Sequence, residues 1–308
     1  MKTHIPNTDI DVYPLCLGTD VFGSYVSEAD SFALMDAYTA QNGNFLDSAH
    51  VYGGGASETT IGRWLRAREN RNQIVIGTKG AHFDVHTGEK RLAPENILSD
   101  LHESLTRLGV DAIDLYYLHR DDEERPVEAI IDVLEGLVQS GKIRYYGLSN
   151  WKTHRLRAAA AYGSHLAACQ NRWSFAAISP HAGLPGDMVC MDAEAHAFHA
   201  ESGLAQVPYS SQGKGYFSKR AQGAVIHADV LRTYECAEND ARYAALQRLA
   251  AKTGAGMEAL ALAFLLRQPF AVVPVIGPKR MEHLAPSLAA APLGLEAADM
   301  QEMLDFEY

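Results

Sequence analysis

Four polar side chains of different chemistry occur in order along the first part of the chain: Asp47, Tyr52, Lys79 and His119. Asp47, Lys79 and His119 each end a short apolar run, and Tyr52 follows Asp47 in a glycine-rich segment. A carboxylate, a phenol, an ammonium and an imidazole that converge are suited to protonating a carbonyl oxygen. These four residues are therefore the candidate catalytic group.

Within this group the phenol is the natural acid and the ammonium its natural activator. Tyrosine has a pKa near ~10, so acid catalysis near neutral pH requires a pKa lower by roughly 3, or about 4 kcal/mol. An ammonium about 4 Å away contributes roughly 4 kcal/mol at an effective dielectric constant near ~20. We therefore expect Lys79 to lower the pKa of Tyr52, with the charge of Asp47 working against it. Taken singly, Asp47 and Lys79 could be a structural ion pair, His119 a core histidine and Tyr52 a surface aromatic.

Apolar runs of strand length recur eight times between segments of helical length. They span residues 15–18, 44–47, 74–79, 113–119, 143–150, 166–170, 204–209 and 271–277. Most are continuous rather than alternating in polarity, which is typical of strands buried on both faces. Polar residues end most of these runs, and in a parallel barrel all such ends open onto one face. The pattern predicts a shared site on that face.

The helical segments complete this architecture. Helices are expected over 27–43, 94–108 and 126–141, where apolar residues recur on one face between capping residues and a terminal glycine. The alternation predicts a single α/β domain over residues 1–308, a (β/α)8 TIM barrel, with long loops at its C-terminal face over 179–187 and 218–239. An open doubly wound sheet is the alternative, although no GxGxxG follows the first run.

Composition narrows the class of protein. The 308 residues carry a formal net charge of −11 without a run of Lys or Arg, which argues against a nucleic-acid partner. The four cysteines form no CxxC pair, so we expect free thiols and no metal site. The N-terminal residues lack the apolar core of a signal peptide, and the longest apolar run, 259–266, is too short for a membrane span. We expect a cytoplasmic protein with no membrane partner; its oligomeric state is left open.

At these residues the sequence resembles the aldo-keto reductase family. The matching segments read FLDSAHVYGGGASE from Phe45, VIGTKG from Val75, IDLYYLHRDD from Ile113, YYGLSNW from Tyr145 and PVIGPKRMEHL from Pro274. The resemblance implies NADPH-dependent reduction of an aldehyde or ketone, in which Tyr52 donates a proton while the nicotinamide delivers hydride. Asp47 and Lys79 would tune Tyr52, and His119 would orient the carbonyl.

The same resemblance implies a set of cofactor contacts. Ser149, Asn150 and Gln170 would hold the carboxamide, and Tyr209 would stack on the nicotinamide ring. Lys279 and Arg280 would pair with a 2′-phosphate, which favours NADP(H) while leaving NAD(H) possible. The full implied set is Ser149, Asn150, Gln170, Tyr209, Ser210, Ser211, Gln212, Gly213, Gly215, Ile276, Gly277, Pro278, Lys279, Arg280 and His283.

The chain departs from the family pattern in two places. Ser210-Ser211-Gln212 stands where serine-proline-leucine is usual, and Pro286-Ser287 stands where a Glu-Asn pair usually grips adenine. At these positions the chain lacks several of the side chains with which the family usually contacts the pyrophosphate and the adenine. We expect the substrate pocket to be lined by His50, Trp151 and Trp173 together with the two long loops.

Other functions are compatible with parts of this pattern. The same scaffold could serve an NAD(P)-dependent sugar or alcohol dehydrogenase, or a cofactor-binding redox-sensing subunit with little turnover. A Schiff-base lyase using Lys79 as nucleophile would leave Tyr209 and the Gly277–Arg280 segment without a role.

Overall fold

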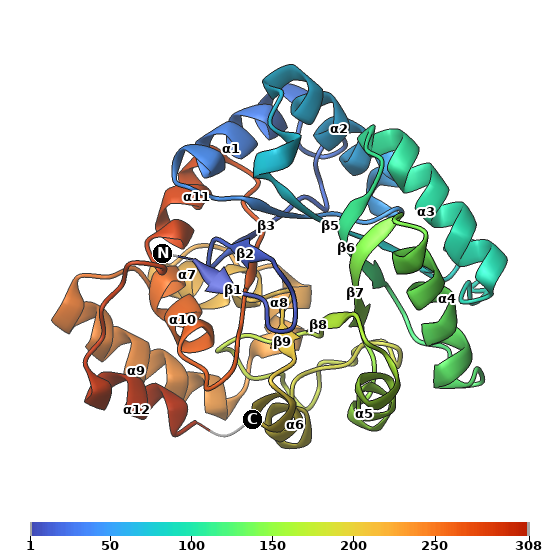
Figure 1. The fold of residues 1–308 in the computed structure, drawn as a ribbon. Coiled ribbons are helices and arrows are strands. Elements are labelled where there is room, and N and C mark those ends of the chain that lie inside the picture. The colour runs from blue at the N-terminus through green and yellow to red at the C-terminus, as the bar shows by residue number, and fades with distance from the viewer. Residues whose placement is uncertain (1, 307–308) are drawn as a thin grey trace.

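The computed structural model describes residues 2–306, which form a barrel of eight parallel strands surrounded by helices (Figure 1). The strands follow the order β10-β3-β4-β5-β6-β7-β8-β9. Their bounds are β3 (Cys16–Gly18), β4 (Phe45–Asp47), β5 (Val75–Gly80), β6 (Ile113–Leu118), β7 (Ile143–Ser149), β8 (Leu166–Gln170), β9 (Ala205–Gln206) and β10 (Val275–Ile276).

The sheet closes on itself. Val275 of β10 pairs with Cys16 of β3, and three residues earlier Val272 forms a parallel bridge with Gln206 of β9. The amide of Val273 also donates to the carbonyl of Gln206 at 2.9 Å. The predicted (β/α)8 barrel is therefore confirmed, and the open-sheet alternative is wrong.

Helices alternate with the strands and pack around the outside of the barrel (Figure 1). They are α1 (Glu28–Ala40), α2 (Ala56–Arg68), α3 (Pro94–Leu108), α4 (Val127–Gln139), α5 (Thr153–Tyr162), α6 (Ala193–Ser202), α7 (Tyr216–Ala221), α8 (Ala228–Tyr234), α9 (Ala237–Thr253), α10 (Met257–Leu266), α11 (Met281–Leu288) and α12 (Ala297–Leu304). Helix α3 has the predicted bounds because Pro94 starts it and Gly109 caps it in the left-handed region. Helices α1 and α4 end before the glycines expected to stop them.

Two strands are shorter than their apolar runs. The runs over 204–209 and 271–277 yield only β9 and β10, and each contains a proline, Pro208 and Pro274. Proline has no N–H to donate to a ladder, so it interrupts regular pairing. The expected loop over 218–239 is also wrong in detail, since it holds the end of α7, all of α8 and the start of α9. Only Val230, Thr233 and Tyr234 of α8 are buried, too few positions to show a helical period.

The apolar residues form two cores. One lies between the helices and the strands, and the other lies inside the barrel around Phe45, Leu115 and Tyr117. A hairpin that the sequence did not reveal, β1 (Thr3–His4) and β2 (Asp11–Val12), adds Ile5 and Ile10 to the inner core. It lies across the N-terminal end of the barrel, in the centre of the view (Figure 1). The C-terminal ends of the strands remain available for a site.

Within residues 2–306 we find no single helix of the length and hydropathy needed to cross a membrane. Helices α9 and α10 reach that length and hydropathy only when taken together, and a bend of 104° separates them.

Candidate active site

Adjacent strands bring Asp47 and Lys79 into contact inside the barrel. Asp47 ends β4 and Lys79 lies near the end of β5, so both side chains point into the C-terminal opening. Lys79 Nζ lies 2.7 Å from Asp47 Oδ2 and donates to the carbonyl of Ser48 at 2.7 Å. The exposed fraction of Lys79 is 1%. A buried ammonium is stable only when it is paired and hydrogen bonded, and both conditions hold here.

Tyr52 is brought to this pair by a tight turn. The segment η1 (Tyr52–Gly55) contains Gly53 at φ 58° and Gly54 at φ 62°, a left-handed conformation that residues with a Cβ rarely adopt. The turn places Tyr52 Oη 3.4 Å from Lys79 Nζ, which also lies 4.9 Å from the centre of the tyrosine ring. The glycines therefore serve to position the phenol.

His119 follows β6 and completes the group. Its ring centre lies 5.7 Å from that of Tyr52, with the two rings nearly perpendicular at 83°. Burial, together with the positive charges of Lys79 and Arg120 and the neighbouring His82, holds the pKa of His119 well below its ordinary value, so the imidazole is neutral. Its Nδ1 atom is buried without a hydrogen-bond partner among residues 2–306. With no acceptor at Nδ1, the proton belongs on Nε2, which makes Nε2 a donor.

The expected acidity of Tyr52 is corrected by the structure. Burial raises the pKa of Tyr52 above its ordinary value, and the opposing effect of Lys79 is offset by the charges of Asp47 and Asp20. Burial also lowers the pKa of Lys79, but Asp47 and Tyr52 more than compensate and its pKa is raised. Desolvation of the buried Tyr52 disfavours its phenolate, and this effect outweighs the proximity of the Lys79 ammonium. The group therefore consists of a charged ammonium and a neutral phenol.

Gln170 joins the same network from the opposite wall of the barrel. Its Nε2 donates to Asp47 Oδ1 at 2.9 Å, although β8 and β4 are four strands apart in the sheet order. Neighbouring strands are about 4.8 Å apart, so a flat sheet would separate these strands by roughly 19 Å. Closure of the barrel thus creates this contact.

The implied carboxamide residues form a connected set. Ser149 Oγ donates to the carbonyl of Gln170 at 2.8 Å, and Asn150 Oδ1 accepts from the hydroxyl of Tyr209 at 2.8 Å. Asn150 has a positive φ of 60°, and its backbone N–H donates to Asn171 Oδ1 at 2.8 Å. Ser149, Asn150, Gln170 and Tyr209 are therefore brought together beside His119, whose carbonyl accepts from Asn150 Nδ2 at 3.3 Å.

The two segments expected to bind phosphates also lie next to each other. Ser211 Oγ donates to the carbonyl of Val275, and Gln212 Nε2 donates to Ser287 Oγ of α11 at 3.0 Å. The turn they belong to, Ser210 to Gly215, has positive φ at Ser210, Gly213, Lys214 and Gly215. Ile276, Gly277 and Pro278 lead from β10 into α11, which has no side-chain cap at its N-terminus. The hydrogen bond between Gln212 and Ser287 joins the two segments in which the chain departs from the family pattern.

Basic side chains surround this helix start. Arg280 precedes α11 and pairs with Glu282 at 2.8 Å, and its Nη2 lies 3.3 Å from His283 Nε2. Lys279 Nζ lies 5.0 Å from the ring centre of Tyr25, which is largely exposed. Uncapped amides and nearby cations at a helix N-terminus form an environment suited to an anion.

Comparison with known proteins identifies the family. A model of the aldo/keto reductase family matches residues 14–306. The chain belongs to the aldo/keto reductase family. The resemblance predicted from the sequence is thus confirmed, and membership places the chain among oxidoreductases of small molecules.

Individual relatives match along most of the chain. It is 32% identical to the aldo-keto reductase ausK of Aspergillus calidoustus, over 98% of this chain and 81% of the relative. It is 30% identical to the aldo-keto reductase yakc [NADP(+)] of Schizosaccharomyces pombe, over 94% of this chain and 85% of the relative. A crystal structure of a thermostable aldo-keto reductase with the inhibitor epalrestat superposes with a TM-score of 0.76 at 22% identity, covering 98% of both chains. The last likeness concerns the fold alone.

The three side chains expected to line the substrate pocket do not join the polar group. The ring of His50 points to α3, with Nε2 3.0 Å from Glu103 Oε2. Trp151 is fully buried with Arg155 over its ring, and Trp173 stacks on Phe270 in an aromatic cluster. Contact of these residues with a substrate stays a prediction.

Sequence reasoning missed two side chains next to the candidate catalytic group. His82 lies with its ring centre 4.7 Å from that of His119. Arg120 donates to the carbonyl of His119 at 3.0 Å, and its Nε lies 2.7 Å from Asp187 Oδ2 in the long loop. His82 and Arg120 each lie two residues after the end of a strand, β5 and β6 respectively, so the strand-end pattern that predicts Lys79 and His119 could also have found them.

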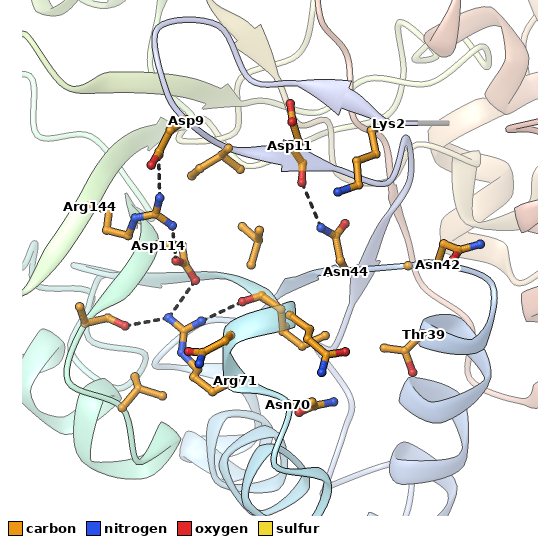
Figure 2. Close-up of a pocket in the computed structure, with 18 of the residues that line it drawn as sticks. Lys2, Asp9, Asp11, Thr39, Asn42, Asn44, Asn70, Arg71, Asp114 and Arg144 are labelled. Atoms are coloured by element: carbon orange, nitrogen blue, oxygen red, sulfur yellow. Dashed lines mark hydrogen bonds and ion pairs between the residues drawn. The ribbon is translucent and has the colours of Figure 1, made fainter.

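A hollow of about 1180 Å³ lies at the other end of the barrel (Figure 2). There Asp114 accepts from Arg144 at 2.8 Å and pairs with Arg71 at 2.9 Å, and Arg144 also reaches Asp9 of the N-terminal hairpin. Figure 2 shows these ion pairs joined in one chain. The hollow faces the N-terminal ends of the strands, whereas sites in such barrels lie at the C-terminal ends. We assign its charges to holding the hairpin in place.

Proposed function

We propose that the protein reduces aldehydes or ketones to alcohols with NADPH, with Tyr52 as the proton donor. The observation that carries the proposal is the position of Lys79 Nζ, 2.7 Å from Asp47 and 3.4 Å from Tyr52 Oη, with His119 beside the phenol. A neutral phenol and a neutral imidazole with its proton on Nε2 offer two donors to one carbonyl oxygen. The family membership of the chain agrees with this chemistry.

The described residues fit a dinucleotide cofactor. Gln170 uses its Nε2 toward Asp47, which leaves its amide oxygen to accept from a carboxamide. Tyr209 would stack on the nicotinamide, the turn from Ser210 to Gly215 would hold the pyrophosphate, and Lys279 and Arg280 would hold a 2′-phosphate. The name of the fission yeast relative specifies NADP(+), which supports this preference. When bound, the cofactor supplies the hydride that the carbonyl carbon receives.

The protein side chains then orient the carbonyl oxygen of the substrate and supply its proton. His119 and Tyr52 donate hydrogen bonds to the carbonyl oxygen, which polarise the bond and fix its orientation. As negative charge develops on that oxygen, the proton of Tyr52 passes to it, because an alkoxide is a far stronger base than a phenolate. Even a phenol with a raised pKa is more acidic than an alcohol, whose pKa is close to that of bulk water. Lys79 then stabilises the phenolate that remains.

The raised pKa of Tyr52 also favours one direction of reaction. Oxidation of an alcohol requires a phenolate to accept the proton, and burial keeps the phenol protonated near neutral pH. Reduction starts from the protonated form, so it needs no prior loss of a proton. The protonated phenol therefore favours the reductase over the sugar or alcohol dehydrogenase.

The test is oxidation of NADPH by the purified 308-residue chain in the presence of activated aldehydes such as para-nitrobenzaldehyde. We expect turnover with NADPH to exceed turnover with NADH. The matched control is Tyr145→Phe, because Tyr145 lies at the N-terminal end of the barrel, where its hydroxyl donates to Asp9. Absence of turnover across a broad aldehyde panel, by protein that is folded and binds NADPH, would contradict the proposal.

A further inference from the structure

A second imidazole lies at the reacting centre. The ring of His82 is 4.7 Å from that of His119, at an interplanar angle of 77°, and His119 in turn contacts the ring of Tyr52. His82 is only partly buried, and it follows the β5 strand that carries Lys79. None of the roles proposed for the candidate catalytic group uses this side chain.

An unfavourable backbone conformation turns His82 toward the site. Ala81, the preceding residue, has a positive φ of 57°, a conformation that residues with a Cβ rarely adopt. Its amide donates to Asp100 Oδ2 of α3 at 2.8 Å, and Asp100 is buried and paired with Arg91. The contact with α3 therefore holds a turn that an alanine would not adopt alone. Such conformations persist where the surrounding structure enforces them, and they cluster at functional sites.

The hydrogen bonding of His82 defines what its free nitrogen can do. Nδ1 lies 2.9 Å from the carbonyl of Phe83, which can only accept, so Nδ1 carries the proton. Burial and the charge of Arg120 lower the pKa of His82, although the Phe83 carbonyl and Asp187 oppose them, and the ring is neutral near pH ~7. Nε2 is then an acceptor, and no hydrogen bond to it is formed by residues 2–306.

We propose that His82 is a specificity-determining residue whose Nε2 accepts a hydrogen bond from a hydroxyl next to the reacting carbonyl. The inference rests on the proposed reductase function and names its preferred substrates as α-hydroxy aldehydes or ketones. His119 donates a hydrogen bond to the carbonyl oxygen, and His82 accepts one from the hydroxyl. The two rings therefore recognise two neighbouring oxygen atoms of one substrate. A substrate with a methyl group in place of the hydroxyl leaves Nε2 without a partner, which is costly in a partly buried site.

The test compares lactaldehyde with isobutyraldehyde, which has a methyl group in place of the hydroxyl and is otherwise similar in size. With the wild-type chain and saturating NADPH, we expect kcat/KM for lactaldehyde to exceed that for isobutyraldehyde by about tenfold. His82→Phe keeps an aromatic ring but removes the acceptor, so the ratio should fall to about one. His82→Gln restores an acceptor and should recover part of the preference. His86→Phe, an exposed position on the same loop, is the matched control and should leave the ratio unchanged.

The outcomes separate the two proposals. A ratio near one in the wild-type chain, or an equal loss for both aldehydes in His82→Phe, overturns the role of His82 and leaves the reductase intact. No turnover of either aldehyde, or of any other carbonyl compound, overturns both. NADPH binding measured by fluorescence for each variant shows whether a lost preference comes from the pocket or from misfolding.

Discussion

Lys79 Nζ and Asp47 Oδ2 lie 2.7 Å apart with both side chains almost wholly buried, so the free energy of each charge depends on the other. Removing one partner leaves a buried charge unpaired, which typically costs about 3–5 kcal/mol. We expect Lys79→Met to lower the free energy of unfolding by about that amount, and the double variant Asp47→Asn with Lys79→Met to lower it by less. Urea unfolding of the single and double variants measures the difference.

A surface ion pair provides the control for this comparison of single and double variants. Arg63 and Glu28 lie 2.7 Å apart but are largely exposed, and such pairs contribute at most about 1 kcal/mol. Arg63→Met should therefore change the free energy of unfolding by less than about 1 kcal/mol. A double variant at Asp47 and Lys79 that is as unstable as the sum of its singles would show that the two charges are independent.

The proton-donor role of Tyr52 gives a second prediction. Tyr52→Phe keeps the ring beside His119 but removes the hydroxyl that lies 3.4 Å from Lys79 Nζ. We expect kcat for an activated aldehyde to fall by about 10²- to 10⁴-fold, the usual contribution of general acid catalysis. The dissociation constant for NADPH, measured by fluorescence, should change little. Retained turnover in a folded Tyr52→Phe protein would remove the phenol from the mechanism.

The candidate catalytic group could be predicted because its signals are local. Asp47, Lys79 and His119 each end an apolar run, and parallel strands in a barrel bring their ends onto one face. The order and spacing of the strands therefore sufficed to bring these residues together. The two shortened strands were also foreseeable, since Pro208 and Pro274 stand within their runs.

Other features depend on contacts between distant segments. The direction of His82 is set by the positive φ of Ala81 and its hydrogen bond to Asp100 of α3, which no local pattern reveals. The raised pKa of Tyr52 depends on burial, a property of the assembled barrel. The inward packing of Trp173 against Phe270 likewise follows from the arrangement of segments nearly a hundred residues apart.

The basic residues before α11 give a third prediction, on cofactor choice. Arg280 is exposed and lies at an uncapped helix start, so its loss should weaken binding of a 2′-phosphate without affecting the rest of the dinucleotide. We expect Arg280→Met to raise the dissociation constant for NADPH by about tenfold and to leave that for NADH nearly unchanged. Arg248→Met, which breaks a surface pair with Glu302, is the control. Equal weakening of NADPH and NADH binding would contradict a contact with the 2′-phosphate.

His199 gives the last prediction, on stability at low pH. Its ring is fully buried, with Nδ1 2.7 Å from the carbonyl of Leu204 and a stacked contact to Phe270. Burial lowers the pKa of His199 to about 4 in the folded protein. The unfolded chain takes up a proton below about pH 6.5, which the folded protein does not, so stability is full above that pH and falls as the pH falls toward 4.

The size of this effect follows from the difference between the two pKa values. Between pH ~7 and pH ~5 the contribution of His199 lowers the free energy of unfolding by about 2 kcal/mol. His199→Asn keeps a donor for the Leu204 carbonyl but does not titrate. Urea unfolding at both pH values should therefore show the wild type losing about 2 kcal/mol more than the variant, whatever the carboxylates contribute to both. Parallel losses in the two proteins would mean that His199 takes up its proton as readily in the folded barrel as in the unfolded chain.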